Sequence, residues 1–281
     1  MKEYSLGLYE KAMPSGMPWG EMLDSANECG FDRVEISIDE SDSRLARLDW
    51  TSLQRAELRN YICESGVPIE TMCLSGHRRF PLGSHDSAVC ERGLEIMQKA
   101  IELASDIGVR IIQLAGYDVY YEQGNSDTEK RFGENLAKST EMAAKSGLIL
   151  GFETMETPFM DTVKKSMHYV HMVESPFLGV YPDIGNLKNA SLVYSSDLLE
   201  DIESGRGHIF AAHLKETVPG IYRDRNFGDG HTEYEPCIKK LWSMGVRMYT
   251  GEFWYLGEPD FKQTLKTSSA FLRSKIEASI K

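Results

Sequence analysis

Short apolar or β-branched runs alternate along the chain with longer stretches that have the pattern of amphipathic helices. In residues 89–107, Leu94, Met97 and Ile101 recur at spacings of three and four, as one buried helix face requires. Residues 53–65 and 129–145 are predicted to form further helices. Eight runs have the length and residue types of strands: 4–9, 33–38, 69–74, 110–115, 149–154, 178–183, 209–215 and 248–253.

Five junctions between these stretches combine a glycine with an apolar residue: Gly30-Phe31, Gly66-Val67, Gly108-Val109, Gly147-Leu148 and Gly245-Val246. Glycine adopts the left-handed conformation that ends helices at little cost, so each pair predicts a helix end followed by a strand. Regular alternation of the two element types predicts a parallel sheet. Eight units in 281 residues suit a closed barrel. We therefore expect one α/β domain over residues 1–281, a (β/α)8 TIM barrel with its active site at the carboxyl ends of the strands.

Composition narrows the possible partners. A hydrophobic fraction of 41% and a charged fraction of 26% are typical of a globular protein with an apolar core. The apolar runs are shorter than a membrane span, and residues 1–15 contain charges and a proline instead of an apolar signal sequence. The net charge of −12 argues against a nucleic-acid partner. The five cysteines form no C-x-x-C pair, which indicates reduced thiols. We expect a cytoplasmic protein with no membrane or nucleic-acid partner.

Four ionisable residues fall at the ends of the last four predicted strands: Glu153, Asp183, His213 and Glu252. They are separated by 30, 30 and 39 residues, close to one strand–helix unit each. Side chains at equivalent positions of neighbouring barrel strands converge on one mouth, where three carboxylates would repel one another unless a cation lay among them. One such glutamate alone would be read as a salt-bridged loop residue. The four together predict a site for Mn²⁺, Zn²⁺, Mg²⁺ or Co²⁺.

Longer motifs accompany these four residues: Leu-Ser-Gly-His-Arg-Arg-Phe-Pro-Leu-Gly-Ser (74–84), Gln-Leu-Ala-Gly-Tyr-Asp-Val-Tyr-Tyr (113–121), Glu-Thr-Met-Glu-Thr-Pro-Phe-Met (153–160), Tyr-Pro-Asp-Ile-Gly-Asn-Leu (181–187), His-Leu-Lys-Glu-Thr-Val-Pro-Gly (213–220) and Phe-Gly-Asp-Gly (227–230). With them, nearly the whole chain resembles the L-xylulose-5-phosphate 3-epimerase (L-ribulose-5-phosphate 3-epimerase) family, within the xylose-isomerase-like TIM barrel superfamily. The resemblance implies an isomerase that reversibly inverts C3 between L-xylulose 5-phosphate and L-ribulose 5-phosphate, in L-ascorbate or related carbohydrate catabolism.

The resemblance also implies a cofactor and an assembly. Members of the family bind one divalent metal ion through residues that match Glu153, Asp183, His213 and Glu252. Zinc or manganese is the first expectation, with magnesium or cobalt as alternatives, and a homodimer is expected. Free-ketose 3-epimerases keep a substrate-side histidine three residues after the aspartate, where this chain has Asn186. This departure favours a pentulose phosphate over a free sugar.

In the implied reaction the four residues have different roles. The C3 proton lies next to the C2 carbonyl, and its removal gives an enediolate whose charge a metal at O2 and O3 would stabilise. Inversion removes the proton from one face and returns it on the other, so two acid–base groups are required. We expect Glu153 and Glu252 to be these groups, because they flank the site on the fifth and eighth strands. Asp183 and His213 are then mainly ligands.

The candidates for contacts with the sugar phosphate are Lys11, His77, Arg78, Arg79, Glu156, Asn186 and Lys215. Among these, Lys11, Arg78, Arg79 and His77 are predicted to bind phosphate, with backbone donors at a helix start beside them. The alternative is that the adjacent arginines are solvated surface charges. The Phe-Gly-Asp-Gly segment at 227–230 is a second phosphate candidate, although Asp229 makes an ordinary turn the better interpretation.

The sequence is compatible with other functions. The same barrel and metal could catalyse aldose–ketose isomerisation, dehydration or free-ketose epimerisation. A phosphodiester nuclease is disfavoured by the charge of −12 and by too few additional histidines. A non-catalytic sugar-phosphate sensor is disfavoured because both predicted bases, Glu153 and Glu252, are present.

Overall fold

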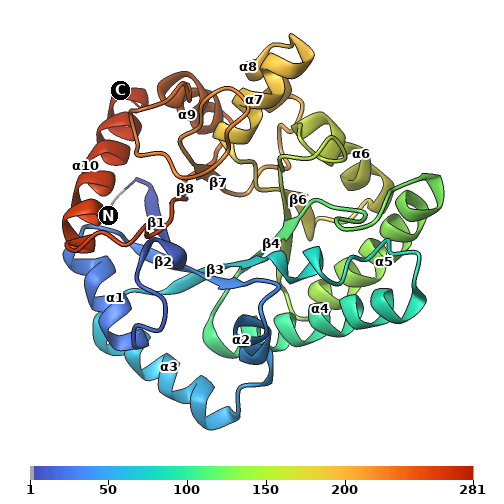
Figure 1. Cartoon of the computed structure of the whole chain (residues 1–281), viewed down its shortest axis with the longest axis horizontal. Coiled ribbons are helices and arrows are strands. Elements are labelled where there is room, and N and C mark those ends of the chain that lie inside the picture. Colours follow the sequence, from blue (N-terminus) through green and yellow to red (C-terminus); the bar gives the residue numbers. More distant parts are fainter. Residues whose placement is uncertain (1–2, 281) are drawn as a thin grey trace.

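The computed structural model describes residues 3–280, and its central feature is a ring of parallel strands (Figure 1). The strands are β1 (Ser5–Tyr9), β2 (Arg33–Ile38), β3 (Ile69–Leu74), β4 (Ile111–Ala115), β5 (Ile149–Glu153), β6 (Leu178–Val180), β7 (Ala212–Leu214) and β8 (Met248–Gly251). Their order is β6-β5-β4-β3-β2-β1-β8-β7. Two isolated parallel bridges, Val180 to Ile209 and Asp183 to His213, close the remaining side between β6 and β7.

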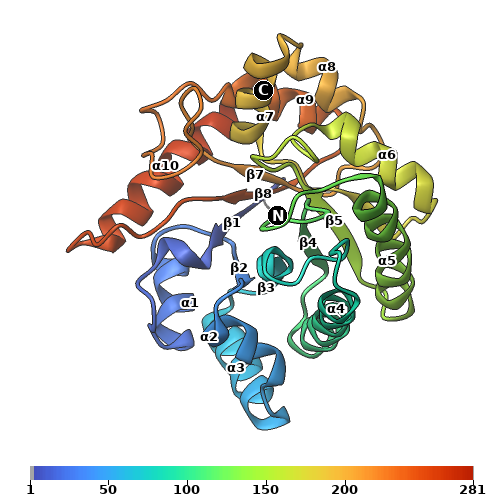
Figure 2. The same cartoon turned by 45° about the vertical axis from the view of Figure 1, so that its right-hand side comes forward.

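Helices surround the strands on all sides, as Figures 1 and 2 show. They are α1 (Trp19–Glu28), α2 (Asp42–Leu45), α3 (Ser52–Ser65), α4 (Ser87–Ile107), α5 (Ser126–Lys145), α6 (Val163–Val173), α7 (Ile184–Tyr194), α8 (Leu198–Glu203), α9 (Tyr234–Ser243) and α10 (Phe261–Ser279). Three short 3-10 helices are η1 (Glu10–Ala12), η2 (Ala46–Asp49) and η3 (Ser75–Arg78). Within residues 3–280, no helix combines the length and apolarity that a membrane crossing requires.

The predicted (β/α)8 barrel is confirmed, and most predicted strands match to within one residue at each end. The glycine junctions also behave as expected, since Gly66 and Gly108 end α3 and α4 with φ of 69° and 91°. The largest difference concerns β6 and β7, which are shorter than predicted. After Val180 the chain reaches Pro182, which has no N–H to donate, and Asp183 then serves as the N-cap of α7.

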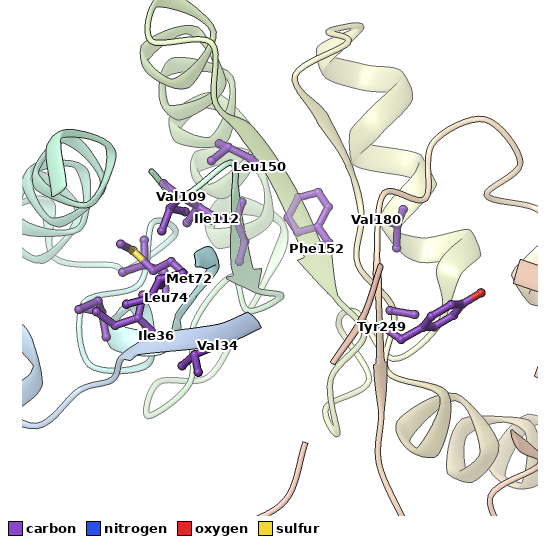
Figure 3. Close-up of a cluster of buried hydrophobic side chains, with 14 of the residues drawn as sticks. Val34, Ile36, Met72, Leu74, Val109, Ile112, Leu150, Phe152, Val180 and Tyr249 are labelled. Carbon is purple, nitrogen blue, oxygen red and sulfur yellow. The ribbon is translucent and has the colours of Figure 1, made fainter. Parts of the chain in front are cut away.

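Alternation along the strands places apolar side chains on the outside of the barrel and, near the carboxyl ends of the strands, polar side chains on the inside. Figure 3 shows Ile36, Met72 and Ile112 close together on β2, β3 and β4, within the core formed with the helices. The alternate positions carry Glu35, Thr71 and Gln113, which are also fully buried. Because successive side chains of a strand point to opposite faces, these polar residues point into the barrel. The barrel interior is therefore polar beneath the candidate site.

Candidate active site

The four ionisable residues predicted at the strand ends lie together. Glu153 ends β5, Asp183 follows β6, His213 lies in β7, and Glu252 directly follows β8. All four are buried, and one ligand atom from each lies within 4.8 Å of the others. The parallel strands deliver their carboxyl ends to the same mouth, which explains why residues about one unit apart in sequence meet in space.

The imidazole of His213 defines the geometry of this cluster. Its Nδ1 lies 3.0 Å from Glu252 Oε2, 3.6 Å from Glu153 Oε1 and 4.0 Å from Asp183 Oδ2. Its Nε2 lies 2.6 Å from Glu35 Oε1, on the other side of the ring. One imidazole nitrogen thus faces the three carboxylates, while the other faces the barrel interior.

The cluster fits a divalent cation. Asp183 Oδ2 is buried and accepts no hydrogen bond from the described residues. The nearest cation is Lys215 Nζ, at 3.3 Å from this oxygen and from Glu252 Oε2. Buried carboxylates in such proximity are stabilised by a positive ion, and three carboxylates with one imidazole are ligands that first-row divalent metals accept.

Burial and neighbouring charges separate the proton affinities of the carboxyl groups. Burial, reinforced by the Glu252 carboxylate, raises the pKa of Glu153. Burial also raises the pKa of Asp183 to about 8, although Lys215 opposes it. For Glu252 burial acts in the same direction, but Lys215 and His213 outweigh it and hold the pKa well below its ordinary value. In the metal-free protein Glu252 is therefore the strongest acid of the three.

His213 and Lys215 carry the positive charge of the metal-free site. Burial opposes protonation of His213, but the carboxylates of Glu35 and Glu252 outweigh it and raise the pKa of the imidazole well above its ordinary value. Burial likewise opposes the charge on Lys215, while Asp183 and Glu252 raise its pKa. The positive charges of these two groups stabilise the neighbouring carboxylates.

A small pocket opens above the cluster, and Glu153 and Glu252 form part of its lining. Five residues predicted to contact the substrate line it: Lys11, Arg78, Glu156, Asn186 and Lys215. The guanidinium of Arg78 lies 4.8 Å from the Tyr120 ring centroid and donates to the Tyr117 hydroxyl at 3.2 Å. Lys11 pairs with Asp39 at 2.5 Å. Both cations are held by neighbours at the pocket wall.

Asn186 lies next to the carboxylates. Its backbone N–H donates to Asp183 Oδ1 at 2.7 Å, and its side-chain Nδ2 donates to the Thr154 carbonyl, also at 2.7 Å. Its Oδ1 is buried and has no hydrogen-bond partner among the described residues. The amide is thus oriented by the protein and leaves one acceptor unused at the pocket.

Two members of the predicted phosphate group lie away from this pocket. The His77 ring is buried against the backbone, with Nε2 3.0 Å from the Gly93 carbonyl, and burial lowers its pKa to about 4. A neutral, enclosed imidazole is unsuited to binding a phosphate. Arg79 is half-exposed and pairs with Asp42 at 2.7 Å. The tight η3 helix turns successive side chains in different directions, so that only Arg78 of these three reaches the pocket.

Two residues that line the pocket, Tyr222 and Trp254, were not singled out by the sequence. Arg223 also lines it, and its guanidinium lies 5.4 Å from the Trp254 ring. The sequence marks Arg223 as a cation that follows His213 in the loop after β7, able to hold a substrate oxygen or to pair with Asp224. Glu35 was also missed, although a charged residue interrupts an otherwise strand-like run at 33–38. Segment 227–230 stabilises the loop after β7, because the Gly228 N–H donates a hydrogen bond to Glu216 Oε2 at 2.8 Å.

The chain is similar to known proteins in sequence and in fold. Residues 23–275 match the family model "Xylose isomerase-like TIM barrel". The chain is 47% identical over 254 residues to L-ribulose-5-phosphate 3-epimerase UlaE of Escherichia coli (strain SMS-3-5 / SECEC), covering 90% of this chain and 88% of that protein. The corresponding protein of Escherichia fergusonii has the same identity and coverage.

Solved structures show the same fold at low sequence identity. D-psicose 3-epimerase with D-tagatose from Clostridium cellulolyticum H10 aligns with a TM-score of 0.82 and 13% identity, over 97% of this chain and 99% of that one. L-ribulose 3-epimerase aligns with a TM-score of 0.74 and 17% identity, over 98% and 95% of the two chains. The 47% identity to these relatives and the match to the family model show that the chain belongs to the L-ribulose-5-phosphate 3-epimerase family of isomerases, within the xylose isomerase-like TIM barrels.

Proposed function

We propose that this protein is a divalent-metal-dependent 3-epimerase that interconverts L-xylulose 5-phosphate and L-ribulose 5-phosphate. The observation that carries the proposal is the buried cluster of Glu153, Asp183, His213 and Glu252 at the floor of a pocket with cationic walls. Family membership supports the same reaction, because the relatives are named for it. Zinc or manganese is the expected metal, with magnesium or cobalt as alternatives.

The four residues of the cluster would hold the cation, His213 through Nδ1. When bound, the cation supplies positive charge beside the substrate oxygens at C2 and C3, where negative charge develops. Asn186 Oδ1, which has no hydrogen-bond partner within residues 3–280, can accept a hydrogen bond from a substrate hydroxyl. Lys215 Nζ can donate to a substrate oxygen from the same wall. These contacts orient the substrate so that C3 lies between the two glutamates.

Proton transfer is assigned to Glu153 and Glu252. One carboxylate removes the C3 proton, and the electron pair of the broken C–H bond moves into the C2–C3 bond as the C2 carbonyl becomes an enediolate oxygen. The other carboxyl group returns a proton to the opposite face of C3, which inverts the centre.

The phosphate is assigned to cations at the pocket mouth, namely Lys11, Arg78 and Arg223. Arg78 is the leading candidate because its buried Nε has no hydrogen-bond partner among the described residues. A planar guanidinium that already rests on aromatic rings can bind phosphate with little further ordering. His77 and Arg79 are left out of this group, since neither lines the pocket.

Deuterium exchange tests the reaction. Metal-stripped protein is given L-ribulose 5-phosphate in D₂O, with Mn²⁺, Zn²⁺, Mg²⁺ and Co²⁺ restored separately. The proposal expects deuterium at C3 of both pentulose phosphates. Exchange confined to C1 would indicate an aldose–ketose isomerase, and absence of turnover with every metal would indicate a binding protein. Glu153→Gln is expected to reduce kcat by about 10³-fold or more, as the loss of an acid–base group does.

A matched pair of variants tests the phosphate assignment. Arg78→Ala removes the pocket guanidinium, and we expect KM for L-ribulose 5-phosphate to rise about tenfold or more, since a charge-assisted hydrogen bond is worth about 1.5–3 kcal/mol. Arg79→Ala removes the neighbouring, half-exposed guanidinium and is expected to leave KM unchanged. Equal effects of the two changes would refute the assignment. The homodimer, the cytoplasmic location and the single domain over residues 1–281 stay predictions.

A further inference from the structure

The two ring nitrogens of His213 have different surroundings. Nδ1 faces the three carboxylates of the proposed metal site, with Glu252 Oε2 at 3.0 Å. Nε2 faces Glu35 Oε1 at 2.6 Å. Gln113 Nε2 lies 3.1 Å from both nitrogens and therefore does not distinguish between them. Glu35 is thus the contact that decides which nitrogen is directed toward the cluster.

Glu35 is itself held firmly in the barrel interior. It lies in β2, its side chain is fully buried, and its Oε2 accepts a hydrogen bond from the Tyr181 hydroxyl at 3.0 Å. That hydroxyl lies 2.7 Å from Thr250 Oγ1, to which Arg33 Nη2 donates at 2.8 Å. Both carboxylate oxygens of Glu35 are therefore engaged, so the group cannot turn away from His213 without losing a hydrogen bond.

A carboxylate at this position requires an explanation other than packing. The interiors of such barrels are usually filled by branched apolar side chains, and a buried carboxylate is costly to desolvate. Glu35 reaches across the barrel from β2 to β7, two strands that are not neighbours in the sheet. Histidines that bind metals commonly donate their second N–H to a carboxylate, which fixes the ring orientation and strengthens the ligand.

We propose that Glu35 is a positioning residue for the metal site. It accepts a hydrogen bond from the Nε2–H of His213 and so keeps Nδ1 directed at the carboxylates of Glu153, Asp183 and Glu252. Glu35 is not a ligand, because the imidazole ring lies between it and the cluster. The inference rests on the proposed function, since it requires a divalent metal at this cluster.

Metal affinity measures this role directly. Mn²⁺ is titrated calorimetrically into metal-stripped protein, and the visible absorption of the Co²⁺-loaded protein reports the ligand field. Glu35→Gln keeps the size and one acceptor oxygen but removes the charge, and we expect Mn²⁺ to bind about tenfold more weakly. The Co²⁺ bands are expected to shift. Glu70→Gln is the matched control, because Glu70 lies 3.8 Å from Arg33 in the same region without contacting His213. The Mn²⁺ affinity of this variant should equal that of wild type.

A double-mutant cycle separates positioning from general destabilisation. If Glu35 acts through His213, Glu35→Gln should change the Mn²⁺ affinity by less than about twofold in a His213→Asn background, because the interaction is already absent. Tyr181→Phe provides a second variant if Glu35→Gln does not fold. It keeps the charge but frees one oxygen, and a smaller loss of affinity, about threefold, is expected.

The outcomes distinguish this inference from the proposed function. In one outcome, wild type binds Mn²⁺ tightly while Glu35→Gln shows the same affinity and the same Co²⁺ spectrum. That result overturns the role of Glu35 and leaves the epimerase proposal standing. An equal loss in the wild-type and His213→Asn backgrounds also overturns it, since the effect would not pass through the imidazole. If wild type binds none of the metals, both the inference and the metal-dependent function fail.

Discussion

Replacing His77 by glutamine should make the protein more resistant to acid. The ring is enclosed by the protein, and burial lowers its pKa from the ordinary 6.5 to about 4. As the pH falls, the unfolded chain therefore binds this proton before the folded protein does, so stability is intact above about pH 6.5 and is lost progressively down to pH 4. At pH 5 the linkage amounts to about 2 kcal/mol in the free energy of unfolding, whereas at pH 7.5 it is close to zero.

The measurement is urea unfolding of wild type and His77→Gln at pH 7.5 and pH 5. Glutamine cannot be protonated but can still donate to the Gly93 carbonyl, which accepts from His77 Nε2. Whatever the variant loses at pH 7.5, we expect about 2 kcal/mol of the difference to be regained at pH 5. His168→Gln, the same replacement at an exposed histidine of α6, is the control variant measured beside it.

Equal losses by wild type and His77→Gln between the two pH values would refute the reasoning. They would mean that the ring takes up its proton without leaving its site. A rise in KM for the phosphorylated substrate, without a change in acid sensitivity, would instead return His77 to the phosphate-binding group predicted from the sequence.

Three further predictions concern the barrel and its metal. Gly7→Ala would place a methyl group 2.6 Å from Arg33 Nη1, and urea unfolding should show a loss of about 1–3 kcal/mol; a wild-type stability would mean that the arginine moves freely. Lys215→Met leaves the carboxylates of Asp183 and Glu252 without their 3.3 Å partner, so the metal-free protein should lose about 3 kcal/mol and regain most of it when metal is added. A loss that is equal with and without metal in melting experiments would contradict this. Chelation of the metal should abolish turnover of wild type and lower its Tm. Calorimetry over a series of free metal concentrations checks this, because Tm should rise with the logarithm of that concentration.

The sequence was sufficient to predict the barrel and the convergence of four ionisable side chains at its mouth. The glycine junctions and the strand-like runs depend on local chain preferences, which are readable without a structure. Glu153, Asp183, His213 and Glu252 were found because a parallel barrel converts a regular sequence spacing into proximity. This inference needs only the strand ends and no side-chain direction.

The part of the site that the sequence could not predict depends on side-chain direction. His77, Arg78 and Arg79 are consecutive, yet η3 directs one into the pocket, one into the core and one to the surface. Glu35 and His213 are 178 positions apart, and their contact depends on how β2 and β7 face one another across the barrel. Neither hydropathy nor spacing carries that information.

Two of the proposed metal ligands, Asp183 and His213, lie at the seam of the barrel, the side where β6 and β7 meet. Between β6 and β7 the ring is closed by two isolated bridges, and one of these pairs Asp183 with His213. A cation held by both residues would tie the first and last strands of the sheet order to each other. Metal occupancy would then set how often this side of the ring opens, so amide hydrogens flanking the seam should exchange faster after chelation while those of β2 and β3 do not. The metal would thereby complete the barrel as well as the active site.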